Sequence, residues 1–127
     1  MRLLLDTQLL VWMLRDSPRA TKVRPLIEAD GVVPVFSLVS LWEVVIKNSL
    51  GRVDFDIPPD RMRARLIAGG TQELPILADH ILAVAHLPPI HRDPFDRLLV
   101  AQAAVEEITL LTADKTIGRY PAPICVV

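Results

Sequence analysis

Carboxylate side chains adjoin apolar segments at four places in the sequence, and together they could hold a metal ion. Asp6 directly follows the first apolar run, and Asp114 comes two residues after Thr109–Thr112. Glu43 and Asp96 lie in segments with helical periodicity. An unpaired buried carboxylate is costly, and four that meet repel one another. A hard divalent cation such as Mg²⁺ or Mn²⁺ prefers oxygen ligands and would offset that repulsion.

Each of these acids also has an ordinary structural interpretation. Asp6 and Asp114 could cap a helix or a turn. Glu43 completes the capping-box pattern Ser40-x-x-Glu43, and it could also pair with Lys47 one helical turn later. The residue types alone leave both interpretations open.

The stretch His91–Val105 predicts the helix that presents one of these acids. Asp93 is the expected N-cap, Pro94 the first helical residue and Asp96 the third. An apolar stripe follows at Leu98, Leu99, Ala101, Gln102 and Val105. We therefore expect a helix buried along its length, with two carboxylates at its positive end.

The elements that must position these acids alternate between apolar runs and helical patterns. The expected strands are Arg2–Leu5, Val32–Phe36, Leu74–Leu77, Thr109–Thr112 and Ile124–Val127. Because these runs are continuously apolar, they favour a parallel sheet that is covered on both faces. We expect one domain over residues 1–127, an α/β three-layer sandwich with a central, mostly parallel sheet of four to five strands flanked by helices. Asp6 and Asp114 would then follow strand ends at the edge where functional groups gather.

Turn and cap signals predict the remaining helices. The expected helices begin near Thr7, run from Ser17-Pro18 to about Ala29, from Ser37 or Ser40 to Gly51, from Asp60 to Gly69-Gly70 and from Asp79 to about Leu87, with a short helix or turn over Asp114–Arg119. Pro34 counts against a central position for its strand.

Composition narrows the class of protein. The 127 residues carry a formal net charge of −1, so any nucleic-acid partner must be held by local basic patches. No apolar run approaches the ~20 residues of a membrane span, and we expect a cytoplasmic protein. Cys125, the only cysteine, excludes an internal disulfide and is expected in the core. We interpret the three histidines, His80, His86 and His91, as surface or structural residues.

Four segments carry a resemblance to a known family. LLLDT, SLWEVVIKNSLGR, RDPFDRLLVAQA and LLTADK, in this order and over nearly the whole chain, resemble the PIN-domain family, and most of all the VapC-type toxins of bacterial and archaeal toxin–antitoxin pairs. The resemblance implies a metal-dependent ribonuclease with Mg²⁺ or Mn²⁺. The implied catalytic residues and metal ligands are Asp6, Glu43, Asp96 and Asp114, with Asp93, Thr7 and Thr112 as supporting residues around them.

Two details qualify this resemblance. The family's acid directly precedes the LLVAQA run, which selects Asp96 rather than Asp93. Gln8 stands where related toxins often have histidine, which concerns substrate positioning at that edge of the site. Asp6 and Asp96 are the expected main ligands, and Glu43 and Asp114 are expected to be outer ligands or to position water.

The resemblance also implies an RNA substrate, a cognate antitoxin and a homodimer. Arg61 and Arg65 share a helix face and are candidate RNA contacts. A second basic cluster comprises Arg15, Arg19, Lys22 and Arg24. Trp12, Trp42 and Ile46 are candidates for an apolar groove that receives a partner, although the core is the default location for each.

Two other functions compete with the nuclease. In the first, the fold is a binding module, catalytically weak, whose acidic pocket mainly receives a partner's arginine. In the second, it is a phosphatase or phosphotransfer domain with an aspartyl nucleophile. Thr7-Gln8-Leu9 follows Asp6 without the second aspartate that dehalogenase-type phosphatases carry, so this function ranks last.

Overall fold

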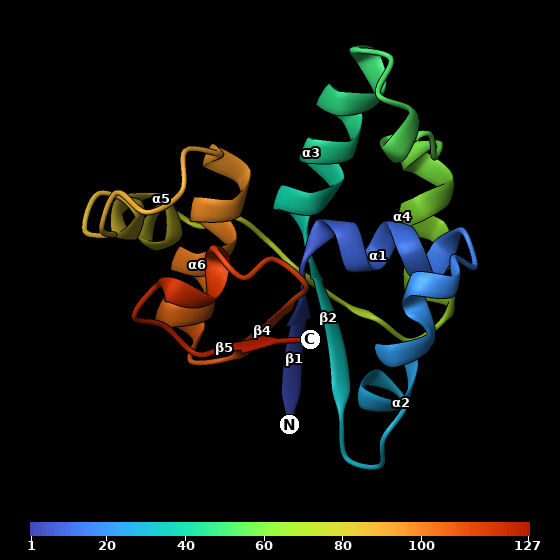
Figure 1. The fold of residues 1–127 in the computed structure, drawn as a ribbon, viewed down its shortest axis with the longest axis horizontal. Helices are drawn as coiled ribbons and strands as arrows, with labels where there is room; N and C mark the ends of the chain where they lie inside the picture. Colours follow the sequence, from blue (N-terminus) through green and yellow to red (C-terminus); the bar gives the residue numbers. More distant parts are fainter.

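Five parallel strands form one central sheet in the computed structural model, which describes residues 1–127 (Figure 1). The strands are β1 (Arg2–Leu5), β2 (Val33–Ser37), β3 (Gln72–Leu74), β4 (Thr109–Thr112) and β5 (Ile124–Val126). Their order is β3-β2-β1-β4-β5, and every neighbouring pair is parallel. The predicted α/β sandwich with a largely parallel sheet is confirmed.

Helices cover both faces of this sheet. They are α1 (Thr7–Leu14), α2 (Arg24–Ile27), α3 (Leu38–Ser49), α4 (Pro59–Ala68), α5 (Ala78–Val84) and α6 (Pro94–Glu106), with 3-10 turns at Pro18–Lys22, Val53–Phe55 and Ile117–Arg119. In Figure 1, α1, α2 and α4 lie on one side of the sheet, and α5 and α6 on the other. None of the helices has the length and apolar composition that a membrane crossing requires.

Alternation along β1 explains why its apolar run is continuous. Leu3 and Leu5 pack into the cluster that includes Leu9 of α1 and Met62 of α4. Leu4 points to the opposite face, into the cluster built around α6. Each β1 side chain after Arg2 is therefore buried, whichever face it occupies.

Prolines account for three differences from the predicted elements. The helix expected from Ser17 to Ala29 is divided into a 3-10 turn and α2, because Pro25 has no amide hydrogen to continue a helix and instead lies in the first turn of α2. The strand expected at Leu74–Leu77 lies instead at Gln72–Leu74 and ends before Pro75. Pro34 is expected to disfavour a central position, yet β2 lies between β3 and β1. Because β3 pairs with β2 only from Val35 onward, the missing amide hydrogen of Pro34 removes no hydrogen bond to β3.

The structure decides one open cap and corrects one local prediction. Of the two caps expected for α3, Ser37 is the one observed, and it accepts the amide of Val39 at 2.9 Å. Cys125 is exposed rather than in the core, because β5 is an edge strand in which only Ile124 is even partly buried. Asp93 caps α6 as predicted, with its Oδ1 accepting the amides of Phe95 and Asp96.

Candidate metal centre

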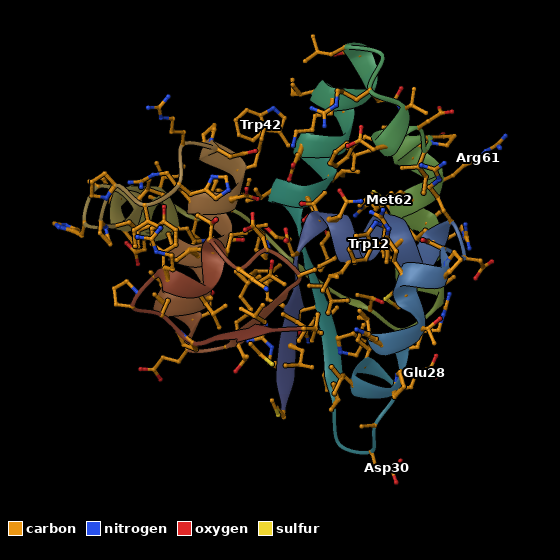
Figure 2. The ribbon with its side chains drawn as sticks, viewed as in Figure 1. Trp12, Glu28, Asp30, Trp42, Arg61 and Met62 are labelled. Atoms are coloured by element: carbon orange, nitrogen blue, oxygen red, sulfur yellow. The ribbon has the colours of Figure 1, made fainter.

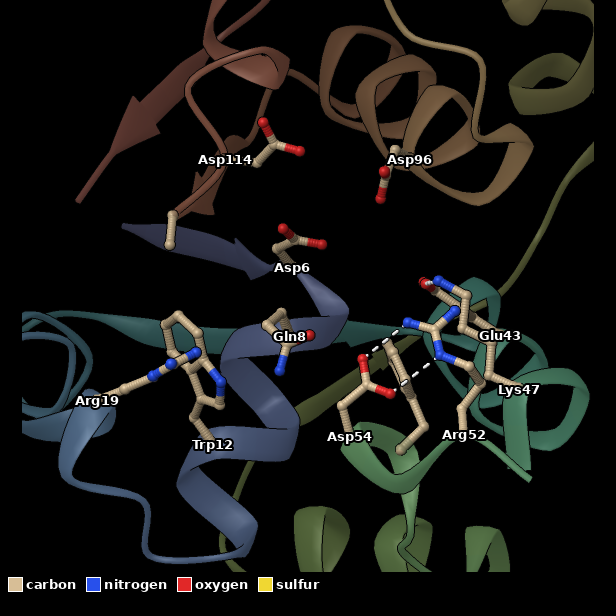
Figure 3. Close-up of a pocket in the computed structure, with 12 residues that line it drawn as sticks. Asp6, Gln8, Trp12, Arg19, Glu43, Lys47, Arg52, Asp54, Asp96 and Asp114 are labelled. Atoms are coloured by element: carbon tan, nitrogen blue, oxygen red, sulfur yellow. Dashed lines mark hydrogen bonds and ion pairs between the residues drawn. The ribbon is translucent and has the colours of Figure 1, made fainter. Parts of the chain in front are cut away.

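One pocket of about 400 Å³ collects the four carboxylates that the sequence singled out (Figure 3). Asp6 follows β1 and Asp114 follows β4, so both lie beyond the carboxyl ends of adjacent parallel strands. Glu43 comes from α3, and Asp96 from the first turn of α6. The structure brings these four side chains together from segments that are far apart in the sequence.

Asp6 is buried at the junction of β1 and α1, with a side chain held by the neighbouring strand. Thr112 Oγ1 donates to Asp6 Oδ2 at 2.7 Å and accepts the amide of Asp114 at 3.0 Å. Burial, reinforced by the charges of Glu43 and Asp114, raises the pKa of Asp6 to about 6, although the Thr112 hydrogen bond lowers it. Thr112 therefore fixes two of the acids relative to each other.

Asp96 is the acid whose ionisation the surroundings oppose most. Burial, followed by the charges of Asp6, Asp93 and Glu43, raises its pKa to about 8, while Lys47 acts in the opposite direction. Its position in the first turn of α6 follows directly from the Asp93 cap. A carboxylate of this kind is held beside other acids without enough positive charge to balance it.

Glu43 combines one satisfied and one orphaned carboxylate oxygen. Lys47 Nζ pairs with Glu43 Oε2 and lies 3.5 Å from Asp93 Oδ2. Burial lowers the pKa of Lys47, but the hydrogen bond and charge of Glu43, with the charges of Asp93 and Asp96, leave it above its ordinary value. Glu43 Oε1 is buried and has no hydrogen-bond partner. That oxygen is free to bind a cation.

Thr7 supports this arrangement from the start of α1. Its Oγ1 donates to Ser40 Oγ at 2.8 Å, which ties α1 to α3 within one turn of Glu43. Both hydroxyls are buried. The hydrogen bond fixes the relative positions of the elements that carry Asp6 and Glu43.

His91 lies against the acids, which the sequence interpretation missed. Its Nε2 is 3.3 Å from Asp114 Oδ2 and 3.3 Å from Asp96 Oδ2. The interpretation of the histidines as surface or structural residues thus omitted the contacts of His91 with two acids, whereas His80 is fully buried. The His91-x-Asp93 spacing just before α6 is a local sequence signal for the hydrogen bond between the Asp93 amide and the His91 ring. The contact of His91 with Asp114 depends on tertiary packing, and no local pattern predicts it.

The positive side chains at the pocket are not all those expected. Arg19 and Arg52 line it together with Lys47 (Figure 3). Arg61 projects into solvent from α4 (Figure 2). Arg65 donates to the Leu14 carbonyl at 2.8 Å and lines a different pocket. The structure thus does not bring the predicted pair on α4 to the acids, because Arg61 faces solvent and Arg65 is bound to the end of α1.

Aromatic rings and a glutamine complete the lining of the pocket. Gln8 and Trp12 reach it from α1, and the Arg19 guanidinium stacks 5.5 Å from the centre of the Trp12 ring. Lys47 Nζ lies 4.6 Å from the centre of the Phe55 ring. Asp6, Asp96 and Asp114 therefore lie on one side of the pocket, and Trp12, Arg19 and the Arg52–Asp54 ion pair lie on the other (Figure 3).

The donor set fits a hard divalent cation. Ligand atoms of Glu43, Asp93 and Asp96 lie within 4.8 Å of one another, as do those of His91, Asp96 and Asp114. The partnerless Glu43 oxygen and the raised pKa values of Asp6 and Asp96 indicate unbalanced negative charge. Since carboxylate oxygens predominate and no cysteine lines the pocket, the set suits Mg²⁺ or Mn²⁺ better than a thiolate-preferring metal.

Comparisons with known proteins agree with this architecture. Residues 3–123 match the PIN domain. The fold is similar to that of VapBC2 from Rickettsia felis bound to a promoter DNA fragment, with a TM-score of 0.73 and 16% identity over 99% of this chain and 98% of that chain. It is also similar to DNA-bound VapBC from Salmonella typhimurium, with a TM-score of 0.67 and 14% identity over 99% of this chain and 98% of that chain. A toxin–antitoxin complex from Klebsiella pneumoniae matches with a TM-score of 0.60 and 15% identity over 97% of this chain and 95% of that chain. Comparison with curated protein sequences gives no significant match.

Proposed function

This chain belongs to the PIN domain family, and from that premise we propose that it is a metal-dependent endoribonuclease, the toxin of a toxin–antitoxin pair. The observation that carries the proposal is the convergence of Asp6, Glu43, Asp96 and Asp114 on one pocket. Their mutual repulsion and the orphaned Glu43 oxygen indicate a place for a cation. Carboxylate-held divalent ions are suited to phosphodiester hydrolysis.

The four acids would take different roles in metal binding. Asp6 and Asp96, whose ionised forms are the most disfavoured without a cation, would be the main ligands of Mg²⁺ or Mn²⁺. When bound, the metal supplies Lewis acidity and lowers the pKa of a coordinated water. Glu43, through its free Oε1, and Asp114, which is partly exposed, are placed to complete the ligand set or to orient the attacking water.

The basic side of the pocket is suited to an RNA backbone. Arg19, Lys47 and Arg52 line the pocket together with the acids; Lys47 is paired with Glu43, and Arg52 with Asp54 at 2.8 Å. Phosphate oxygens would pair with these cations while the scissile phosphate reaches the carboxylates. Trp12 offers a flat surface beside Arg19 on which a base could stack. These contacts depend on backbone charge and stacking, which explains how a chain of net charge −1 would bind RNA.

An apolar strip on α3 supports the proposal that the protein has macromolecular partners. Trp42 (labelled in Figure 2), Val45, Ile46 and Leu50 are all exposed. The Trp42 ring makes an edge-to-face contact with the Phe95 ring, with 4.8 Å between ring centres. Exposed apolar surface of this kind marks protein interfaces. We assign it to a second copy of the chain or to an antitoxin; the Klebsiella pneumoniae structure is a toxin–antitoxin complex.

One observation favours the binding-module alternative. Lys47 already places a cationic head between Glu43 and Asp93, so a partner's arginine would find compatible chemistry in the same pocket. A folded protein that binds metal and partner but cleaves no RNA would support this function over the nuclease.

The test is cleavage of a mixed tRNA, rRNA and mRNA pool by purified, partner-free protein with Mg²⁺, Mn²⁺ or EDTA. We expect metal-dependent cutting that Asp6→Asn and Asp96→Asn both abolish. Asp60→Asn is the matched control, since Asp60 also lies in the first turn of a helix but is exposed and outside the pocket. Cutting that persists in EDTA, or that survives in both site variants with folding verified by circular dichroism, would overturn the proposal.

A further inference from the structure

We infer that His91 is a positioning residue of the site, whose Nε2–H holds Asp114 and Asp96 in the arrangement that binds metal. The inference rests on the proposed function and deepens it. His91 Nε2 hydrogen-bonds Asp114 Oδ2 at 3.3 Å and lies at the same distance from Asp96 Oδ2. One ring nitrogen therefore bridges a carboxylate that follows β4 and a carboxylate at the start of α6.

The hydrogen bond at the other ring nitrogen decides what Nε2 can do. His91 Nδ1 accepts the backbone amide of Asp93 at 3.1 Å, so in the neutral ring the proton is on Nε2. Nε2 is then a donor toward the two carboxylates. A metal ligand at Nε2 would need a lone pair there and a proton on Nδ1, which would oppose the amide hydrogen of Asp93. The geometry thus favours a donor over a metal ligand.

The segment that carries His91 is braced from several sides. The His91 amide donates to Tyr120 Oη at 2.7 Å. Arg97 Nη1 donates to the same hydroxyl at 3.2 Å and to the Pro88 carbonyl at 3.0 Å. Arg97 Nη2 donates to the carbonyl of Val84 at 3.2 Å. These contacts attach the segment before α6 to α6 itself and to the buried Tyr120.

Asp114 is the acid that most needs this support. Its side chain is 39% exposed, against 14% for Asp96. Its Oδ1 accepts the amide of Thr116 at 2.8 Å, and Oδ2 meets His91. Without the Nε2 donor, Oδ2 would be free to rotate toward solvent. Groups that orient metal ligands in this way contribute about 10- to 100-fold in metal affinity or activity.

Two substitutions separate the role of the Nε2 donor from that of the hydrogen bond between Nδ1 and the Asp93 amide. In His91→Gln, the side-chain amide nitrogen reaches about where Nε2 stands and can still donate to the carboxylates. In His91→Asn, the shorter side chain can still accept the Asp93 amide but cannot reach Asp114. We expect Mn²⁺ affinity, measured by electron paramagnetic resonance without RNA, to fall about 10- to 100-fold in His91→Asn and to stay near wild type in His91→Gln.

The outcomes distinguish this inference from the proposed function. Equal Mn²⁺ affinity in wild type and both folded variants overturns the positioning role, whatever RNA cleavage does. Equal loss in both variants also overturns it, because the ring itself would then be required. Metal binding that follows the expected order without any RNA cleavage supports the role of His91 and contradicts the nuclease.

A nuclear magnetic resonance measurement tests the tautomer directly. At pH 8 the His91 ring nitrogens should show a proton on Nε2, both before and after addition of Mg²⁺. Loss of that proton on Mg²⁺ addition would identify His91 as a ligand and would overturn the donor role.

Discussion

Replacing Asp96 by asparagine should remove most of a specific pH dependence of stability in the metal-free protein. Burial, then the charges of Asp6, Asp93 and Glu43, raises the pKa of Asp96 from 3.8 to about 8. The folded state therefore holds this proton more tightly than the unfolded state. The free energy of unfolding accordingly falls as pH rises above the unfolded pKa, and it levels off only above the folded pKa.

The magnitude follows from the two pKa values. Between about pH 6 and pH 8, this one proton lowers the free energy of unfolding by about 2 kcal/mol. The pKa of Asp6 is raised only to about 6, so the folded state loses this proton near the lower end of that pH range. Asp6 therefore contributes much less than Asp96 to the change in the free energy of unfolding between pH 6 and pH 8. The slope between these two pH values therefore reports mainly on Asp96.

Urea unfolding in EDTA at the two pH values, followed by circular dichroism, measures this slope. Wild type and the control Asp60→Asn should each be less stable at pH 8 than at pH 6, and Asp96→Asn should lack about 2 kcal/mol of that difference. If Asp96→Asn kept the wild-type slope, Asp96 would not be the strained carboxylate that we describe.

Three further predictions concern substrate, core and pocket. Arg52→Gln should reduce the salt slope of RNA binding by about 0.7, whereas Arg61→Gln should leave it unchanged; equal effects would contradict the pocket assignment. Leu99→Ala, in the buried part of α6, should lower the free energy of unfolding in urea by about 2–5 kcal/mol, and the exposed Leu82→Ala should change it little. Lys47→Met should destabilise the metal-free protein, because it leaves the buried charge of Glu43 without its ion-pair partner. Thermal unfolding should show that Mg²⁺ raises the stability of this variant more than that of wild type.

Local signals were enough to predict the elements that carry the acids. The Asp93-Pro94 start and the apolar stripe of α6 act within one helix, and the structure shows the cap and the burial of Leu98–Ala103, whereas Val105 of the predicted stripe is exposed. Strand β4 has the predicted bounds, Thr109–Thr112. Some elements shifted where a proline removes a backbone donor, as Pro75 does at the end of β3. The helix expected from Asp79 to about Leu87 instead spans Ala78–Val84, with Leu77 rather than Asp79 at its N-cap.

Contacts between distant segments could not be predicted in the same way. That Arg61 and Arg65 share a helix face is a local fact, but whether that face meets the acidic pocket depends on how α4 packs. The contact of His91 with Asp114 joins residues 23 positions apart. The Glu43–Lys47 pair was foreseen from helical spacing, whereas its second partner, Asp93, lies on another element.

The start of α6 concentrates several tasks into one short segment. Asp93 caps the helix with Oδ1 and faces Lys47 with Oδ2, while its backbone amide fixes the ring of His91. The same cap sets the position of Asp96, because Asp93 Oδ1 accepts the Asp96 amide. Arg97 holds the segment before α6 by donating to the Pro88 carbonyl. Because one turn of helix provides both the acid and the groups that orient it, a substitution at Asp93 should disturb helix, histidine and acid together. Substitution of His91 is therefore the cleaner way to separate orientation of the acids from formation of the helix.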